Sequence, residues 1–277
     1  MSTFSTCTSS TRPPSPNDGA VLFETDTKNV IIWDGTNWRG YQYDSVFGWT
    51  GSSAYSMSFD GTDDYLNLSS VPTGTATSGT ISAWIKTNTN AFMPIFSVSN
   101  NSSGVTNEWI LLQIDSGGKF EIISNRLGTV EVYESSSTVT DNAWHHVMVT
   151  SNGSSYKLFL DGSEQTSASG NNTGTWIGDI GTKNSCNIGA QRRGADSSNS
   201  YFSGSLDEVA VWDSDQSSNI STIYNSGTPG NLSSLSPNHW YRMGDNNAAS
   251  GTAINDQGSD GINATAVNGP TYSTDVA

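Results

Sequence analysis

Cysteine is scarce in this chain, and so are positively charged side chains. Two of the 277 residues are cysteine, Cys7 and Cys186, which argues against a disulfide framework as a source of stability. Lysine and arginine number 11 against 26 aspartate and glutamate residues, giving a formal charge of −15. Because a nucleic-acid partner needs a basic surface against its phosphates, this composition argues against one.

Long hydrophobic runs are also missing. Apolar stretches such as Val30–Trp33 and Trp109–Leu112 fall far short of the roughly 20 residues that span a bilayer. The first residues have neither the basic start nor the apolar stretch of a secretory signal. We therefore expect no membrane insertion and no export through a signal peptide.

Glycine is abundant, with 28 residues, and serine, threonine and asparagine crowd the segments between short apolar runs. This pattern is typical of many short strands joined by tight turns. Strand-like runs occur at 56–59, 65–68, 81–86, 95–98, 109–114, 119–124, 130–133, 144–150, 156–160 and 206–212. One short helix is predicted over 217–225, where apolar residues recur at helical spacing before Gly227.

The first 45 or so residues differ from the rest. After the proline-rich Pro13–Pro16 come strand-like runs at Ala20–Thr25, Val30–Trp33 and around Trp38, separated by turn-type tetrads. The spacing predicts a small β-meander. So few residues cannot bury an adequate core, so we expect this arm to dock on another surface.

Four β-type segments stand in a fixed order across the middle of the chain: Phe59–Leu66, Thr80–Lys86, Trp144–Thr150 and Gly204–Trp212. Together they resemble the laminin-G-like, pentraxin-like branch of the concanavalin A-like lectin/glucanase superfamily. The resemblance implies an all-β fold, an antiparallel two-sheet jelly-roll sandwich that usually binds rather than catalyses. We expect two domains, the arm over 1–45 and the jelly roll over 46–277. The C-terminal strand is expected to return and close the sandwich, and the alternative is a separate contact arm.

The arm carries a second resemblance. Arg12–Gly19, Leu22–Thr27 and Trp33–Trp38 look like a short module found in tail-fibre and other structural proteins of bacteriophages. This implies a virion component that is assembled in the host cytoplasm and exposed on the particle surface. Residues 1–45 would bind other virion proteins or identical subunits. A homo-oligomer is therefore expected, with a trimer favoured, because three copies of the arm could together bury a core that a single copy is too small to form.

These resemblances give the expected function: a non-enzymatic bacteriophage structural protein, a fibre, appendage or decoration, whose outward lectin-like domain is a candidate for adhering to host-surface polysaccharide. The alternative is a free carbohydrate-binding lectin or adhesin of a bacterium. A glycoside hydrolase ranks third. The glucanase branch places its acid and nucleophile as Glu-x-Asp-x-x-Glu or Glu-x-Asp-x-Glu, and no such string is present. Asp207 and Glu208 are strand neighbours that should point to opposite faces, so no catalytic residue is assigned.

Calcium is the one cofactor that the sequence suggests. Its coordination needs several oxygen ligands converging from loops, and members of the resembled family often hold an ion at the sandwich rim. Asp60 and Asp207 are the first candidates, and Asp63, Asp64 and Glu208 are weaker ones. In the alternative reading Asp60 stabilises its own turn and Asp207 accepts backbone hydrogen bonds.

Sugar binding needs aromatic rings beside amide and carboxylate groups on loops. Trp176 and Tyr201, with Asn172 and Asp179 near in sequence, are the candidates. The loop residues Arg192–Arg193 would either contact an acidic glycan or partner, or form a solvated turn.

Two further pairs are expected to be structural. Trp84 and Trp144 resemble buried positions of the family. His145 and His146 are adjacent on a strand and should diverge, one packed against the sheet and one solvated, so no transition-metal site is expected.

Overall fold

The computed structural model describes residues 6–14, 16–17, 20–24, 29–33, 35–42, 53–71, 74–102, 108–192, 200–245 and 249–277. The chain divides into two compact units, residues 1–52 and residues 53–277. The boundary expected after residue 45 lies outside the described residues.

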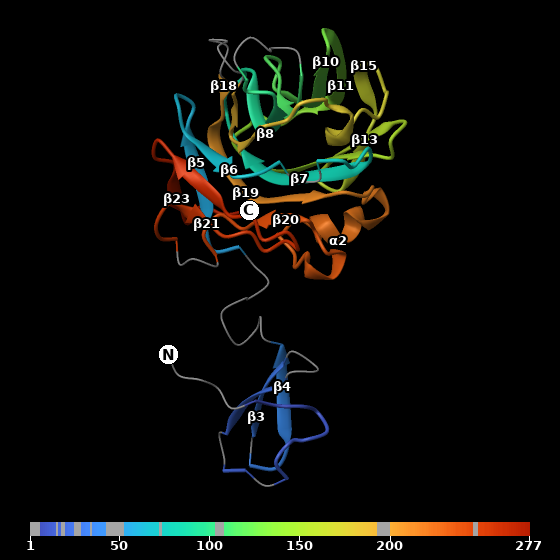
Figure 1. The fold of residues 1–277 in the computed structure, drawn as a ribbon. Coiled ribbons are helices and arrows are strands. Elements are labelled where there is room, and N and C mark those ends of the chain that lie inside the picture. The colour runs from blue at the N-terminus through green and yellow to red at the C-terminus, as the bar shows by residue number, and fades with distance from the viewer. Residues whose placement is uncertain are drawn as a thin grey trace. The chain divides into compact units, whose positions relative to one another are not determined.

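The first unit is a four-stranded sheet in the order β1-β2-β3-β4; β3 and β4 are labelled in Figure 1. Its strands are β1 (Thr6–Cys7), β2 (Val21–Glu24), β3 (Asn29–Trp33) and β4 (Trp38–Gln42). β2, β3 and β4 form the expected antiparallel meander, and β1 adds to β2 in parallel. Ile31 and Glu24 are buried, and Glu24 Oε2 accepts a hydrogen bond from Arg12 Nη2 at 2.9 Å. A buried carboxylate thus has a guanidinium partner.

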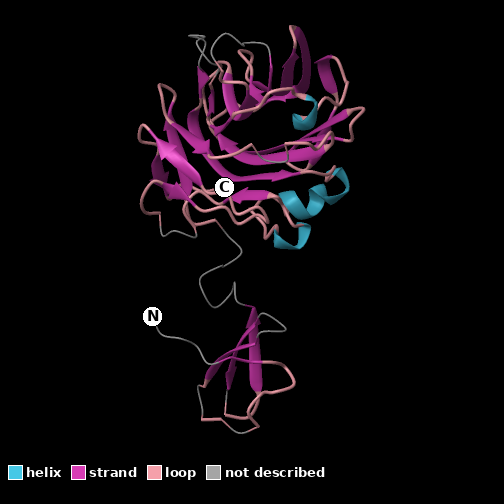
Figure 2. Cartoon of the chain, viewed as in Figure 1, coloured by secondary structure: helices cyan, strands magenta, loops and turns pink. Residues whose placement is uncertain are grey.

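The second unit is a sandwich of two large antiparallel sheets, which confirms the expected all-β jelly roll (Figures 1 and 2). The nine-stranded sheet runs, in spatial order, through β15 (Ser167–Gly170), β11 (Thr129–Thr138), β10 (Lys119–Arg126), β9 (Glu108–Ile114), β8 (Met93–Ser99), β16 (Ser185–Ile188), β6 (Tyr65–Leu68), β22 (Ala264–Val267) and β21 (Ala253–Ile254). The eight-stranded sheet runs through β14 (Ser163–Gln165), β13 (Tyr156–Leu160), β12 (Trp144–Ser151), β7 (Gly79–Lys86), β19 (Ser203–Trp212), β5 (Ser56–Asp60) and β23 (Thr271–Ser273), with β20 (His239–Tyr241) paired to β19.

Helix is confined to short pieces (Figure 2). The expected helix appears as the 3₁₀ turn η2 (Ser217–Asn219) followed by α2 (Ile220–Tyr224), and two more 3₁₀ turns, η1 (Ile177–Asp179) and η3 (Ser233–Leu235), were not predicted. Three-residue turns carry no helical periodicity that a sequence pattern could show.

The two faces of each sheet are used differently. Alternate residues of both sheets fill the core between them, among them Met57, Leu66, Ile81 and Phe96. A second apolar cluster covers the other face of the eight-stranded sheet, beneath α2, and consists of Met148, Phe159, Ala210, Trp212, Ile223, Leu232 and Trp240. The residues that alternate with the core on the nine-stranded sheet are instead largely polar, as at Asn67, Ser97 and Asn187. This outward polar face is the surface on which a site can form.

A hairpin lies on that face. After Gly189 (φ +79°), a left-handed turn that suits glycine, the chain folds back over β8 as β17 (Ala190–Gln191), which pairs with β18 (Ser200–Tyr201). The outward hydroxyls of Ser97 and Ser99 donate to the carbonyls of Ala190 and Arg192, at 2.6 and 2.7 Å. β8 therefore fixes the backbone of the hairpin.

The C-terminal segment closes the sandwich, as expected. β22 pairs with β6 in the nine-stranded sheet, and β23 pairs with β5 in the eight-stranded sheet. Asp275 adds an ion pair to Lys86 at 2.7 Å and accepts a hydrogen bond from Trp144 Nε1 at 3.0 Å. Trp144 is thus half-buried at this seam, while Trp84 is buried as expected.

Candidate functional site

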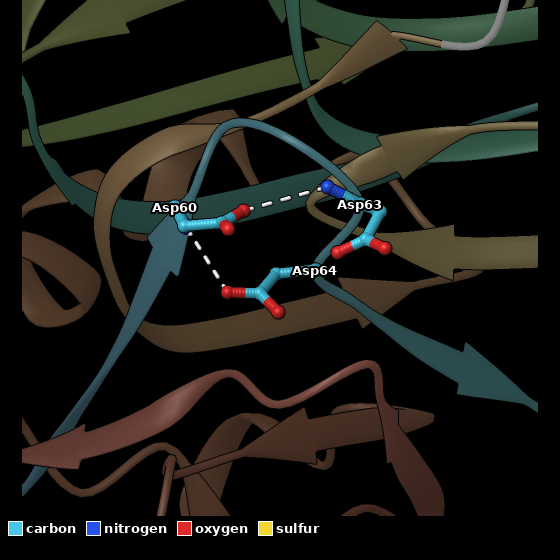
Figure 3. A group of neighbouring side chains, drawn as sticks. All are labelled: Asp60, Asp63 and Asp64. Carbon is cyan, nitrogen blue, oxygen red and sulfur yellow. Dashed lines mark hydrogen bonds between the residues drawn. The ribbon is translucent and has the colours of Figure 1, made fainter.

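The loop between β5 and β6 carries three of the predicted metal ligands, Asp60, Asp63 and Asp64 (Figure 3). One carboxylate oxygen of each lies within 4.8 Å of the others. Two oxygens that each bind an ion at about 2.4 Å are at most about 4.8 Å apart, so this spacing fits a calcium ligand set. The cluster can bind a metal ion.

The same carboxylates also stabilise the loop. Asp60 Oδ1 accepts the backbone N–H of Thr62 at 2.7 Å, which lowers the pKa of Asp60, and it accepts the N–H of Asp63 at 3.4 Å. Asp64 is buried, and burial raises its pKa. Its Oδ2 accepts the N–H of Asp60 at 3.1 Å, so the turn is closed from both ends (Figure 3). The turn-stabilising role expected for Asp60 is present whether or not an ion binds.

A second acidic group, Asp115, Glu121 and Glu134, was not predicted. The pairing of β10 with β11 places Glu121 opposite Glu134, although the two are distant in sequence. Glu121 is buried, which raises its pKa, and it accepts a hydrogen bond from Gln113 at 2.6 Å. Lys119 already supplies a cation here, because its Nζ lies 2.6 Å from Glu134 Oε1.

Asp207 and Glu208 lie apart from the Asp60 loop. Asp60 pairs with Ser203 across the β5–β19 ladder, and Asp207 lies four residues further along β19, about 13 Å at the usual strand rise. Neither Asp207 nor Glu208 belongs to an acidic group of metal-binding spacing among the described residues. Asp60 and Asp207 therefore do not share one ion. Asp207 Oδ1 instead accepts the N–H of Glu208 at 2.8 Å, as the alternative reading expected.

The prediction that Asp207 and Glu208 face opposite sides of a regular strand was wrong. The β19–β7 ladder has a bulge between Asp207 and Ala210, and Glu208 has a left-handed backbone (φ +49°). A bulge breaks strict alternation. Both carboxyl groups are consequently buried and both feel the charge of Asp245.

An ion-pair network surrounds these carboxyl groups. Arg242 donates from Nε to Glu208 Oε1 at 3.0 Å and from Nη2 to Asp245 Oδ2 at 2.6 Å. Trp240 Nε1 donates to the other oxygen of Glu208. Burial raises the pKa of Glu208 to about 7 and raises the pKa of Asp207 well above its usual range. This network joins β19 to the C-terminal segment and has a structural role.

The two histidines diverge as predicted. His146 is fully buried, its Nε2 lies 2.8 Å from Ser82 Oγ, and burial lowers its pKa to about 4. His145 points to the other side, where its ring nitrogens lie 2.8 Å from Asp161 and 3.1 Å from Asp141. His145 is thus half-buried rather than solvated, and two carboxylates hold it.

The four predicted sugar-contacting residues occupy different places. Trp176 is fully buried in the core, so its ring has no exposed face. Asn172 bonds the backbone of Tyr156, and Asp179 Oδ2 accepts the N–H of Trp176 at 2.9 Å, closing η1. Tyr201 is half-buried on β18, beside the outward polar face.

Tyr201 belongs to a cluster that sequence reasoning only partly identified. Its ring centroid lies 6.5 Å from that of Tyr65, which projects from β6. The guanidinium carbon of Arg192 lies 5.0 Å from the Tyr65 ring centroid, and Nη1 donates to the Tyr65 hydroxyl. Gln191, the neighbour of Arg192, is buried. We name Tyr65, Gln191, Arg192 and Tyr201 the hairpin cluster. Alternation along β6 signalled an outward Tyr65, but no local pattern places it beside β18.

This arrangement can bind a polar ligand. Aromatic rings next to a guanidinium and an amide combine an apolar surface with fixed hydrogen-bond donors.

No helix in the described ranges has the length and hydropathy needed to span a bilayer.

Comparisons with known proteins agree with the fold. Residues 60–219 match a family model described as the concanavalin A-like lectin/glucanases superfamily. Among curated proteins, none matches the chain.

Several solved structures are similar. A candidate carbohydrate-binding protein of Bacteroides ovatus is 16% identical over 93% of this chain and 70% of its own, with a TM-score of 0.57. The CBM40 module of the Ruminococcus gnavus IT-sialidase, bound to α2,3-sialyllactose, is 20% identical over 60% of this chain and 94% of its own, with a TM-score of 0.51. A heptameric SAP-like pentraxin of Limulus polyphemus is 17% identical over 62% and 82%, with a TM-score of 0.48. At these identities, the likeness to the first two structures establishes the fold alone.

Proposed function

The protein belongs to the concanavalin A-like lectin/glucanases superfamily, whose model spans residues 60–219, and we propose that it is a non-enzymatic carbohydrate-binding protein. The observation that carries the proposal is the difference between the two sheets. The eight-stranded sheet is covered by apolar packing on both faces, whereas the nine-stranded sheet presents polar side chains and the hairpin cluster on its outward face.

The comparisons support this proposal at the level of class. The similar structures include a carbohydrate-binding module in complex with a saccharide and a candidate carbohydrate-binding protein. A hydrolase is the weaker candidate, because the carboxylate strings of the glucanase branch are missing from the sequence. Glu208 is engaged by Arg242, and Asp207 Oδ1 accepts the backbone N–H of Glu208.

As the setting of this activity we propose a bacteriophage virion. The protein would be a fibre, appendage or decoration, assembled in the host cytoplasm, with the jelly roll on the particle surface binding host polysaccharide. The first unit would attach it to other virion proteins or to two further copies of itself. The support is the bacteriophage-like sequence of the arm and its four-stranded sheet, in which Glu24 and Ile31 are the residues found buried among those whose side chains are described. A free bacterial lectin or adhesin is the competing setting.

We further propose calcium as the ion of the Asp60, Asp63 and Asp64 loop. An all-oxygen donor set from a single exposed loop suits a hard cation. Asp60 Oδ2 and the Asp63 carboxylate make none of the hydrogen bonds that close the loop, so they are the groups that would bind the ion.

The test of carbohydrate binding is a saccharide array probed with the full chain. Saturable binding to at least one saccharide, without release of a shorter sugar, is the expected result. The absence of binding to every saccharide would contradict the proposal, and release of product would favour a hydrolase.

The setting needs a separate measurement. Light scattering gives the solution mass of the full chain and of a chain that begins at Ser53, where the second unit begins. We expect a trimer or larger assembly that becomes a folded monomer on shortening. A full chain that is itself monomeric would favour the free lectin.

A further inference from the structure

Arg192 is one of three cationic side chains, with Arg126 and Lys183, that have no carboxylate partner among the described residues. The chain has 26 acidic residues against 11 basic ones, so carboxylate partners are plentiful. Within the described part of the chain, five cationic side chains pair with a carboxylate: Arg12, Lys86, Lys119, Lys157 and Arg242. Arg192 is half-buried, yet none of the described carboxylates lies within ion-pair distance of it. A partly desolvated guanidinium without an anion is costly unless a ligand supplies one.

The position of Arg192 is fixed from two sides. Its carbonyl accepts the hydroxyl of Ser99 at 2.7 Å, which ties the backbone to β8. Its guanidinium carbon lies 5.0 Å from the Tyr65 ring centroid, and Nη1 donates to the Tyr65 hydroxyl. A ligand would therefore meet a preorganised cation, which reduces the entropy lost on binding.

Unused hydrogen-bond donors remain beside it. Arg192 Nε is buried and has no hydrogen-bond partner among the described residues, and the same holds for Gln191 Nε2. Gln191 is only 2% exposed, so bulk water does not replace the missing partner. Since Nη1 is used by Tyr65, the Nε and Nη2 edge of the guanidinium is left, and this edge matches a carboxylate bidentately. Both unused groups donate, so the complementary ligand group is an acceptor with several oxygens.

Tyr201 adds the aromatic component. Its ring centroid lies 6.5 Å from that of Tyr65. Tyr201 is half-buried and keeps part of its surface exposed, whereas Tyr65 is 6% exposed and faces Arg192. A pyranose ring can pack its C–H face on such a ring while a substituent reaches the guanidinium. The cluster thus offers one apolar contact and one anion contact.

We infer that the hairpin cluster binds a saccharide bearing a carboxylate, with the carboxylate on the Nε and Nη2 edge of Arg192 and a sugar ring against Tyr201. The inference rests on the proposed function and adds a ligand class and named contacts to it. The formal charge of −15 repels anions at long range, but screening over about 8 Å at physiological salt leaves the local contact dominant.

The test measures calorimetric affinity of the full chain at 0.15 M salt for 3′-sialyllactose and an oligogalacturonide. Each is compared with its own carboxyl-reduced form, in which the carboxylate is an alcohol. We expect at least one acidic probe to bind about tenfold or more tightly than its reduced form, the range of a charge-assisted hydrogen bond. Arg192→Gln should abolish that preference. Arg126→Gln, which removes an exposed arginine from β10, should retain it.

Two results would overturn the inference. If acidic and reduced probes bind equally, or if Arg192→Gln keeps the preference for the acidic probe, Arg192 does not bind a carboxylate. The proposal of carbohydrate binding is unaffected by either result. If neither probe pair binds but the array shows neutral saccharides bound, the ligand class is wrong and the proposed function is right. The comparison of acidic with reduced probes needs no variant, so it tests the preference for a carboxylate even if Arg192→Gln fails to fold.

Discussion

His145 is a titratable group whose charge stabilises the fold. The hydrogen bond to Asp161 raises its pKa, so the folded state favours the imidazolium. That stabilisation is complete below the unfolded pKa of about 6.5 and is lost as pH rises through the higher folded pKa. We predict that His145→Gln lowers the free energy of unfolding more at pH 6 than at pH 9, measured by urea titration. Asp141→Asn removes the more exposed partner and should have a smaller effect; equal losses at both pH values would contradict the prediction.

Arg242 compensates two buried carboxylates, Glu208 and Asp245. Breaking a buried ion pair from one side costs about 3–5 kcal/mol. We expect Arg242→Met to destabilise the protein by this order, and more at pH 8 than at pH 5, because Glu208 with a pKa of about 7 is protonated at the lower pH. Denaturant unfolding at pH 5 and pH 8 measures the loss of stability and its dependence on pH. Lys157→Met breaks the exposed pair with Glu164 and should cost less than about 1 kcal/mol.

The Asp60 loop and the Asp115 group can be distinguished by calcium. A ligand that binds the native state at 100 times its Kd stabilises it by about 2.7 kcal/mol. We predict that calcium raises the thermal midpoint of the full chain and that Asp63→Asn removes this rise. Glu134→Gln, in the other acidic group, should retain it. If Glu134→Gln removes the calcium-dependent rise in thermal midpoint and Asp63→Asn retains it, the ion belongs to the group of Glu134. A rise in thermal midpoint with magnesium alone would argue against a calcium site.

At the scale of single elements, the β10–β11 hairpin has an unfavourable residue at its tip. Leu127 (φ +51°) and Gly128 (φ +93°) both have positive φ, as a type I′ turn requires, and Leu127 is 84% exposed. Asparagine tolerates this backbone far better than leucine. Leu127→Asn should therefore stabilise the protein by up to about 1 kcal/mol, seen as a higher thermal midpoint. Leu127→Val is the control and should lower it.

Elements differ in how well their sequences predicted them. Strand β12 could be predicted from its β-type residues, and the Asp161-Gly162 turn from its residue types, because both depend on neighbours in sequence. The Glu121–Glu134 pair depends on strand register, which a sequence pattern does not state. The bulge at Glu208 interrupts the alternation of side chains along β19, although the sequence of that strand gives no sign of it.

The candidate site was less predictable than the fold for the same reason. Tyr201 was identified, and Arg192 was noted as a loop cation with two possible roles. Their meeting with Tyr65 requires the β17–β18 hairpin to lie on β8, a contact made by the hydroxyls of Ser97 and Ser99. Serine is common throughout this chain, so those two positions carried no signal of their own.

On the scale of the whole molecule, the C-terminal segment completes both sheets. Removing residues 270–277 takes β23 from β5 and breaks the bonds of Asp275 to Lys86 and Trp144. We expect a lower thermal midpoint and aggregation detectable by light scattering, since the edge of β5 would be left unpaired. Asp275→Asn alone, at a half-exposed pair, should cost less than about 1 kcal/mol and leave the protein soluble.

The position of β22 and β23 also has a consequence for biosynthesis. β5 and β6 emerge from the ribosome about 200 residues before β23 and β22, their last partners. The nine-stranded sheet therefore cannot reach its full width until residue 267 has been made, and the eight-stranded sheet not until residue 273. The nascent chain must keep two open strand edges from pairing with other chains during that interval. Long-range pairing of this kind slows folding and prolongs exposure. The yield of folded protein in an expressing cell should therefore depend on the rate of translation and on the supply of chaperones.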